Sequence, residues 1–224
     1  MIKLENTILP SADQWKAIIF GARNPLNSWA RSDSKFDEEA DFDPEDYPCG
    51  FELGDNDYSL MQRLAKAGTD HRKFMRMITV YIDITAPLYW WKEFDTYKIG
   101  TVANSCSTMH KIAEKEFTLE DFSHEHLLPT AKKNLESTID ILNGYRDQYN
   151  VDTNSEVKKA YWWQMIQLLP SSYNQKRTVM LNYEVLANMY KSRKNHKLDE
   201  WHDLCAWIES IPCSELITGE AKTE

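Results

Sequence analysis

The sequence has little glycine, no long apolar run and no Cys-x-x-Cys pair. Seven glycines stand among 224 residues, and no glycine-rich phosphate-binding loop of either common type can be drawn. No run of about 18 apolar residues is present, so we expect no membrane-spanning helix. The spacing of the four cysteines argues against a zinc knuckle or a thioredoxin-type redox pair. The first ten residues lack the features of an export signal, and we expect free thiols in a reducing, cytoplasmic compartment.

Basic residues are outnumbered by acidic ones, 26 against 35, which gives a net charge of −9. Proteins that coat nucleic acids carry an excess of Lys and Arg, so we expect no nucleic-acid partner. Residues 33–57 alone carry a charge of −10, and the rest of the chain carries +1. We interpret 33–57 as a solvated acidic loop or insertion. The near-neutral remainder can hold a local cationic pocket for a small anionic nucleotide.

Apolar residues form 42% of the chain, enough for a packed core, and the length suits a single domain over 1–224. Residues 74–85 alternate and are rich in β-branched side chains, which predicts a strand with Ile78, Val80, Ile82 and Ile84 on one face. Helical patterns precede this strand at 57–67 and follow it from Pro87 to Phe94 and at 130–148, 155–168, 177–192 and 198–209. We predict a mixed α/β (α+β) fold, a small twisted β-sheet packed with several helices, with a flexible C-terminal tail at 214–224.

A few side chains could carry chemistry by themselves. His124 and His126 lack further ligands nearby, so we interpret them as surface residues and expect no metal site. Cys106 could be a nucleophile only with a lowered thiol pKa, and no nucleophile signature surrounds it, which favours a packed or inert thiol. The tandem aromatics Tyr89-Trp90-Trp91 and Tyr161-Trp162-Trp163 could stack on a flat ring, but helical patterns favour core packing or a subunit interface.

The order of elements from Asp55 to about Glu209 resembles the flavin-dependent thymidylate synthases. The family signature is Arg-His-Arg-x-x-Ser-x-Asn-Glu-x-Ser-x-Arg-Tyr, preceded by a strand and an Ala-Pro-hydrophobic helix. Here the strand at 74–85 runs into Ala86-Pro87-Leu88-Tyr89. The signature itself is altered: Arg-His-Arg falls on Thr96-Tyr97-Lys98 and the first Ser on Thr101. With one residue inserted near Ala103, the later positions fall on Asn104, Ser105, Ser107, Met109 and His110. Downstream, Leu169-Pro170, Asn182, Asn188, Arg193 and His196 have the family's order and similar spacing.

The resemblance implies a mixed α/β homotetramer with active sites built between subunits. It implies methylation of deoxyuridine monophosphate at C5 with methylenetetrahydrofolate, reduced FAD and NADPH, the flavin supplying the hydride. The residues expected to bind the nucleotide are Lys98, Thr101, Asn104, Ser105, Ser107 and Arg193. Those expected to bind the cofactor are Thr96, Tyr97, Asn182, Asn188 and His196. No catalytic residue is assigned.

Departures from the signature keep two other functions open. Lys98 alone keeps a cation from Arg-His-Arg, and Met109 replaces an arginine that meets the nucleotide. Arg193, Arg177, Arg23 and Arg31 could compensate, whereas Arg146 lies on a helix that we expect to be exposed. One alternative is a non-catalytic protein that binds or sequesters a nucleotide on the same scaffold. The other is a helical interaction protein whose Trp-rich helices form an oligomer interface. Arg193 and His196 could also simply complement the C-terminal dipole of their helix.

Overall fold

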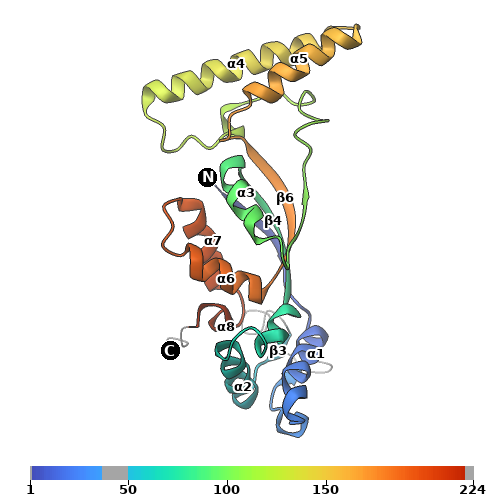
Figure 1. The fold of residues 1–224 in the computed structure, drawn as a ribbon, viewed down its shortest axis with the longest axis vertical. Coiled ribbons are helices and arrows are strands. Elements are labelled where there is room, and N and C mark those ends of the chain that lie inside the picture. Colours follow the sequence, from blue (N-terminus) through green and yellow to red (C-terminus); the bar gives the residue numbers. More distant parts are fainter. Residues whose placement is uncertain (1, 37–49, 220–224) are drawn as a thin grey trace. The chain divides into compact units, whose positions relative to one another are not determined.

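The computed structural model describes residues 2–36 and 50–219, which form a mixed α/β fold (Figure 1). This confirms the predicted fold class. The helices are α1 (Ala12–Arg23), α2 (Asp55–Lys66), α3 (Leu88–Phe94), α4 (Pro129–Val151), α5 (Ser155–Leu168), α6 (Tyr183–Arg193), α7 (Asp199–Ser210) and α8 (Glu215–Thr218). The strands are β1 (Lys3–Ile8), β2 (Lys35–Phe36), β3 (Phe51–Glu52), β4 (Thr79–Pro87), β5 (Val102–Ser105) and β6 (Asn174–Asn182). Five short 3-10 turns also occur in the described chain: η1 (Asn24–Leu26), η2 (Trp29–Arg31), η3 (Arg72–Arg76), η4 (Asp95–Tyr97) and η5 (Leu119–Asp121).

The strands form a four-stranded sheet in the order β1-β4-β6-β5 and a separate two-stranded sheet. In the smaller sheet, β2 and β3 pair antiparallel, with Lys35 opposite Glu52 and Phe36 opposite Phe51. Along β4 the predicted face is confirmed, because Val80, Ile82 and Ile84 are buried and Tyr81 is exposed. Such alternation is what a strand with one face on a core requires. Among the described helices, none is long and apolar enough to cross a membrane.

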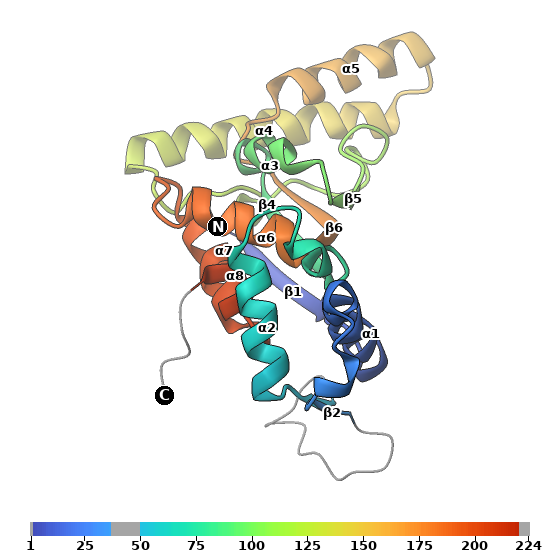
Figure 2. The same cartoon turned by 60° about the horizontal axis from the view of Figure 1, so that its bottom comes forward.

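The chain divides into two compact units, and the single-domain organisation stays a prediction. The first unit contains Met1–Lys3, Ile84–Thr96 and Asn104–Arg177. In it α4 and α5 form a helical hairpin, and both views show them side by side (Figures 1 and 2). Its core is built from apolar side chains of these helices and of the loop before them: Ile112, Ala113, Phe117, Phe122, Leu135, Ile139, Leu142 and Met165.

The second unit contains Leu4–Asp83, Tyr97–Ala103 and Thr178–Glu224. Figure 2 shows α1 and α2 of this unit lying side by side. Trp15 on α1 is fully buried and stacks on Phe51, with 4.8 Å between ring centroids. Helix α6 packs against η3, α7 and α8, which brings the turn before β4 next to the helix after β6. This packing of η3 on α6 builds the site described below.

Two sequence predictions fail locally. The predicted helix at 177–192 is strand β6 up to Asn182 and helix α6 from Tyr183, because Val179 and Leu181 alternate into the core and Asn182 caps the helix. The predicted strand at 74–85 begins only at Thr79, because the preceding residues form η3.

The C-terminal end of the predicted acidic loop and the start of the predicted tail are packed. Within 33–57, predicted to be solvated, Asp57 is fully buried; residues 37–49 lie outside the described residues. Within 214–224, predicted to be a flexible tail, residues 215–218 form α8, whose Leu216 and Ile217 are buried; residues 220–224 lie outside the described residues.

Candidate functional site

A cavity of about 600 Å³ lies in the second unit, between η3, the start of α6 and the turn at Gly100. Its volume is in the range of small-molecule and cofactor sites. Polar and charged side chains predominate in its lining, which consists of Thr69, Arg72, Arg76, Ile99, Gly100, Asn182, Glu184, Val185 and Asn188.

Asn182 ties two walls of this cavity together. Its Oδ1 accepts a hydrogen bond from the Val185 backbone N–H at 3.0 Å, which caps the N-terminus of α6. Its Nδ2 donates to the Gly100 carbonyl oxygen at 3.3 Å. Gly100 has a φ of +86°, a conformation that favours glycine, and a Cβ there would lie 3.0 Å from Asn182 Nδ2. Asn182 therefore fixes the turn at Gly100 against the start of α6.

Glu184 links the two arginines of the cavity. Arg72 Nε donates to Glu184 Oε1 at 3.0 Å, and Arg76 Nε donates to Glu184 Oε2. The hydrogen bond from Arg76 is the main cause of the lowered pKa of Glu184, and Arg72 adds to it. Arg72 Nη2 also donates to Asn188 Oδ1 at 3.3 Å. Two guanidiniums share one carboxylate, so this cluster keeps one net positive charge at neutral pH.

Apolar surface lies beside this charge. The Ile99 side chain is 95% exposed, although isoleucine is among the residue types most often buried. Val185, which is buried, lines the same cavity. A cation next to apolar surface suits a ligand that has both an anionic group and a flat apolar part.

Arg193 lies in a second cluster of the same unit, on aromatic rings. Its Nε donates to Tyr97 Oη at 2.9 Å, and its guanidinium lies 4.7 Å from the centroid of the Trp201 ring. The His196 ring lies edge to face with the same Trp201 ring, with 6.3 Å between the ring centroids. Its Nδ1 accepts a hydrogen bond from the Leu198 N–H at 3.2 Å. Stacking on Trp201 holds a planar guanidinium in place. Arg193 is thus a positioned cation.

The structure groups the predicted site residues in three ways. Asn182 and Asn188 line the cavity, and Tyr97, Arg193 and His196 surround Trp201. Lys98 is exposed next to Tyr97, and Thr101 Oγ1 donates to the Tyr97 carbonyl at 2.8 Å.

The remaining four predicted site residues belong to the first unit: Thr96, Asn104, Ser105 and Ser107. Thr96 Oγ1 donates to the Glu93 carbonyl, Ser107 Oγ accepts from the His110 N–H, and Asn104 and Ser105 are exposed on β5. The binding roles of all these residues stay predictions.

Sequence reasoning missed Arg72, Arg76 and Glu184. The two arginines are four residues apart before a strand, and Glu184 is two residues after Asn182, so each was visible only as an ordinary charge. Their contact spans 108 or more residues of sequence. An Asn followed by a helical pattern is an N-cap signal, and reading Asn182 in this way would have separated β6 from α6.

Two of the arginines proposed to compensate have structural partners instead. Arg23 is 3% exposed and pairs with Asp57. Arg177 Nη1 donates to Asp95 at 2.9 Å, and its guanidinium lies 4.2 Å from the centroid of the Trp91 ring. Arg146 is on helix α4, which is mostly exposed as expected, although its own side chain is only 19% exposed.

The other candidates have ordinary surroundings. His124 Nδ1 lies 2.8 Å from the Phe122 carbonyl oxygen, and the described residues hold no cluster of three potential metal ligands. Cys106 is exposed, so of the two expected alternatives it is not a packed thiol, and an inert thiol stays a prediction. Trp90 and Trp91 are buried, which confirms core packing, whereas Trp163 is 43% exposed.

Comparison with solved structures finds crystal structures of ThyX, the flavin-dependent thymidylate synthase of Helicobacter pylori, complexed with FAD and dUMP. Two of them match with a TM-score of 0.63 and 16% and 17% sequence identity. The match covers 97% of this chain and 97% and 98% of theirs. The chain has the fold of these synthases. No protein-family model matches the sequence, and the comparison with curated proteins found no match.

Proposed function

We propose that this chain is a divergent flavin-dependent thymidylate synthase-like protein that binds FAD and a pyrimidine nucleotide. One observation carries the proposal. In a chain whose fold matches ThyX over nearly its whole length, the two asparagines that the family resemblance assigns to the cofactor, Asn182 and Asn188, line one cavity.

The side chains of this cavity fit the chemistry of FAD. A dinucleotide carries an anionic pyrophosphate, which Arg72 and Arg76 can meet with charge-assisted hydrogen bonds. The Asn188 amide can donate to or accept from the polar edge of a ring. Ile99 offers the exposed apolar surface that a flat ring system would cover. Bound FAD would supply the hydride, and the chain's own residues would hold and orient the ligands.

The proposed nucleotide site is built on Arg193. Its guanidinium, held by Tyr97 and Trp201, is a positioned cation that can attract a phosphate. Lys98, directly after Tyr97 and exposed, can add a second cation. The proposed reaction is methylation of the pyrimidine at C5, from dUMP to dTMP, with methylenetetrahydrofolate and NADPH as co-substrates, in a cytoplasmic homotetramer.

A second candidate is a non-catalytic nucleotide-binding or sequestering protein on the same scaffold. It is favoured by the loss of the signature cations at Thr96, Tyr97 and Met109. It is also favoured by Glu184, whose carboxylate occupies the cavity wall and already pairs with both arginines. A carboxylate there competes with any anionic ligand for the guanidiniums.

A fluorescence titration of FAD tests the cofactor site. Asn188→Ala removes an exposed amide of the cavity, and Lys191→Ala on the same helix, exposed and outside the cavity lining, is the matched control. We expect wild type and Lys191→Ala to bind FAD equally and Asn188→Ala to bind about tenfold more weakly, as for one hydrogen bond. Equal affinity of all three proteins would contradict the assignment of the cavity.

Turnover of dUMP to dTMP separates the two candidate functions. The enzyme hypothesis predicts dTMP when FAD, NADPH and methylenetetrahydrofolate are all supplied, and loss of nucleotide binding in Arg193→Ala. Calorimetric binding of dUMP without any turnover would support the non-catalytic candidate. Retained dUMP affinity in Arg193→Ala would exclude Arg193 from the site.

A further inference from the structure

A second cavity of about 600 Å³ lies in the second unit, between α2 and the segment that follows α1. It shares no residue with the proposed flavin cavity. Arginines and small polar residues dominate its lining: Arg23, Leu26, Asn27, Ser28, Ala30, Arg31, Asn56, Ser59, Leu60 and Arg63. No Asp or Glu is among these described lining residues, although the protein as a whole is acidic.

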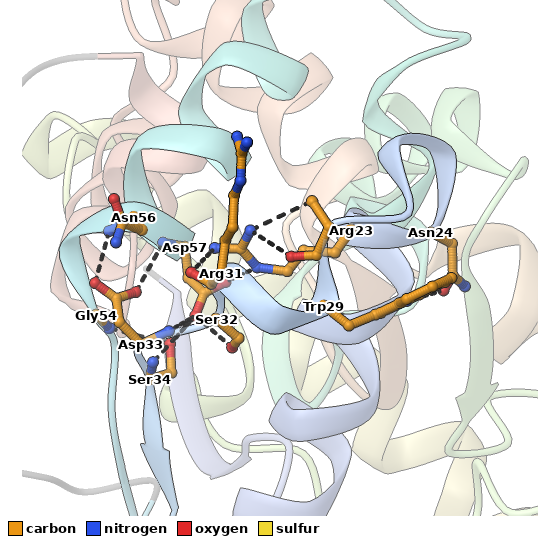
Figure 3. A network of polar contacts seen from close by, with 11 residues as sticks. Arg23, Asn24, Trp29, Arg31, Ser32, Asp33, Ser34, Gly54, Asn56 and Asp57 are labelled. Carbon is orange, nitrogen blue, oxygen red and sulfur yellow. Dashed lines mark hydrogen bonds and ion pairs between the residues drawn. The ribbon is translucent and has the colours of Figure 1, made fainter.

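Arg23 lines this cavity. Its guanidinium is held by other residues of the chain (Figure 3). Its Nε donates to Asp57, its Nη1 to the Ser28 carbonyl at 3.1 Å and its Nη2 to the Arg31 carbonyl at 2.9 Å. These bonds fix the backbone of the segment after α1. Arg23 therefore shapes the cavity wall, and its charge is balanced by Asp57.

Arg31 and Arg63 are different, because both are exposed. Figure 3 shows the Arg31 side chain extending away from the carboxylates of Asp33 and Asp57. Within residues 2–36 and 50–219, neither guanidinium makes a hydrogen bond or an ion pair. The cavity thus carries two positive charges that no described carboxylate neutralises.

Helix α2 supplies one continuous wall. Asn56, Ser59, Leu60 and Arg63 follow the i, i+3, i+4, i+7 spacing that places side chains on one helix face. The N-terminus of α2 is not available to a ligand, because Asp33 accepts hydrogen bonds from the Asn56 N–H at 3.0 Å and the Asp57 N–H at 3.2 Å. Side chains, rather than the helix dipole, must recognise a ligand here.

We propose that this cavity binds a small phosphomonoester that has an apolar body. Arg31 and Arg63 hold the dianionic phosphate, since guanidinium offers paired donors to phosphate oxygens. Ser59 and Asn56 add neutral hydrogen-bond donors. Leu26, which is 58% exposed, and Leu60 contact the apolar part. Two unpaired cations favour a dianion over a monoanion of the same shape.

Isothermal titration with phenyl phosphate tests this site without any flavin present. Benzoate and benzyl alcohol serve as monoanionic and neutral analogues. We expect phenyl phosphate to bind more tightly than benzoate, and benzyl alcohol to bind most weakly. Benzoate binding as tightly as phenyl phosphate, or no binding of phenyl phosphate, would overturn the proposal.

Variants locate the site. Arg31→Gln and Arg63→Gln remove exposed side chains, so neither should disturb folding. We expect each substitution to weaken the binding of phenyl phosphate about tenfold, because one charge-assisted hydrogen bond is lost. The controls are Arg76→Gln in the flavin cavity and Lys133→Gln, exposed on α4, and both should leave the affinity unchanged. A loss in Arg76→Gln with none in Arg31→Gln would place the anion in the other cavity and refute the proposal.

Discussion

Two arginine–carboxylate clusters in the second unit contain the same chemical groups but differ in burial. Arg23 and Asp57 are 3% and 0% exposed, and Asp57 also accepts from Ser32 Oγ at 2.8 Å and Ser34 Oγ at 2.7 Å. In the other cluster, Arg72 and Arg76 are 22% and 46% exposed and face a cavity together with Glu184. The first cluster has nearly every donor and acceptor satisfied within the chain, whereas the second has donors left for a ligand.

Burial and the number of satisfied hydrogen bonds distinguish a structural charge from one that is available for binding. Burying an ion pair is tolerated only when further hydrogen bonds satisfy it, as they do at Asp57. An ion pair at a cavity wall contributes less to the stability of the fold, but its groups remain able to exchange partners with a ligand. We therefore expect the Arg23–Asp57 pair to govern stability and the Arg72–Arg76–Glu184 cluster to govern binding.

Asp57→Ala should show the largest effect. It leaves the Arg23 guanidinium buried without its carboxylate, and breaking a buried pair in this way costs about 3–5 kcal/mol. Urea unfolding measures this loss directly. Glu184→Gln is the matched change in the exposed cluster and should shift the urea midpoint much less. A larger shift for Glu184→Gln would reverse the assignment of the two clusters.

Gly54→Ala tests how tightly the buried cluster is packed. Gly54 precedes α2, and a Cβ there would lie 2.3 Å from Asp33 Oδ1 and 2.5 Å from the Asp33 backbone carbon. The helix cap made by Asp33 must then move, and overpacking of this kind costs about 1–3 kcal/mol. Gly144→Ala on α4 is the control, because its Cβ would meet nothing within 4 Å. It should stabilise its helix by about 0.5–1 kcal/mol. Similar unfolding free energies for the two variants would contradict this packing.

Acid should weaken both clusters. Burial raises the pKa of Asp57, but hydrogen bonds from Ser34, Ser32 and Arg23 outweigh it, so the pKa falls below the ordinary value of 3.8. The pKa of Glu184 falls below its ordinary 4.5, mainly through the bond from Arg76. Between the folded and the ordinary pKa values, the unfolded chain binds more protons than the folded chain. The stability that these two carboxylates contribute is therefore fully present above their ordinary pKa values, and it is lost as the pH falls through their folded pKa values.

The measurement is the urea midpoint as a function of pH. It should be flat down to about pH 5 and fall below that, since both unfolded carboxylates titrate there. In Glu184→Gln the fall should begin at lower pH. An unchanged profile in that variant would mean that Glu184 makes no contribution to acid sensitivity.

Arg76→Gln should have the smallest effect on folding and a clear effect on binding. The side chain is 46% exposed, so we expect the loss of its bond to Glu184 to lower the urea midpoint only slightly. Removing one of the two guanidiniums of the cavity should weaken the binding of FAD about tenfold. Loss of stability without loss of FAD affinity would make the second cluster structural, like the first.

Local patterns allowed much of the fold to be predicted. Helices α2, α5 and α7 begin and end within two residues of their predicted bounds, because amphipathic spacing and N-terminal signals occur within each segment. The strand β6 was missed because its nine residues continue into α6 without a break in apolar spacing. The register of the sheet depends on partners far away in sequence, which no local pattern contains.

The candidate site was predictable only where a family spacing existed. Asn182 and Asn188 were found from such a spacing, and both line the cavity. Arg72, Arg76 and Glu184 meet only because η3 packs on α6, and a charge seen alone in the sequence has no visible partner. The same holds for Asp33, which caps α2 from more than 20 residues away.

The visible absorbance spectrum tests the central claim, that the cavity between η3 and α6 is a flavin site. Purified protein is mixed with FAD, with or without dUMP, and freed of unbound flavin by gel filtration. We expect the wild-type protein to stay yellow and to show a perturbed flavin band, and Asn188→Ala to retain less flavin. A colourless wild-type protein, both with and without dUMP, would contradict it.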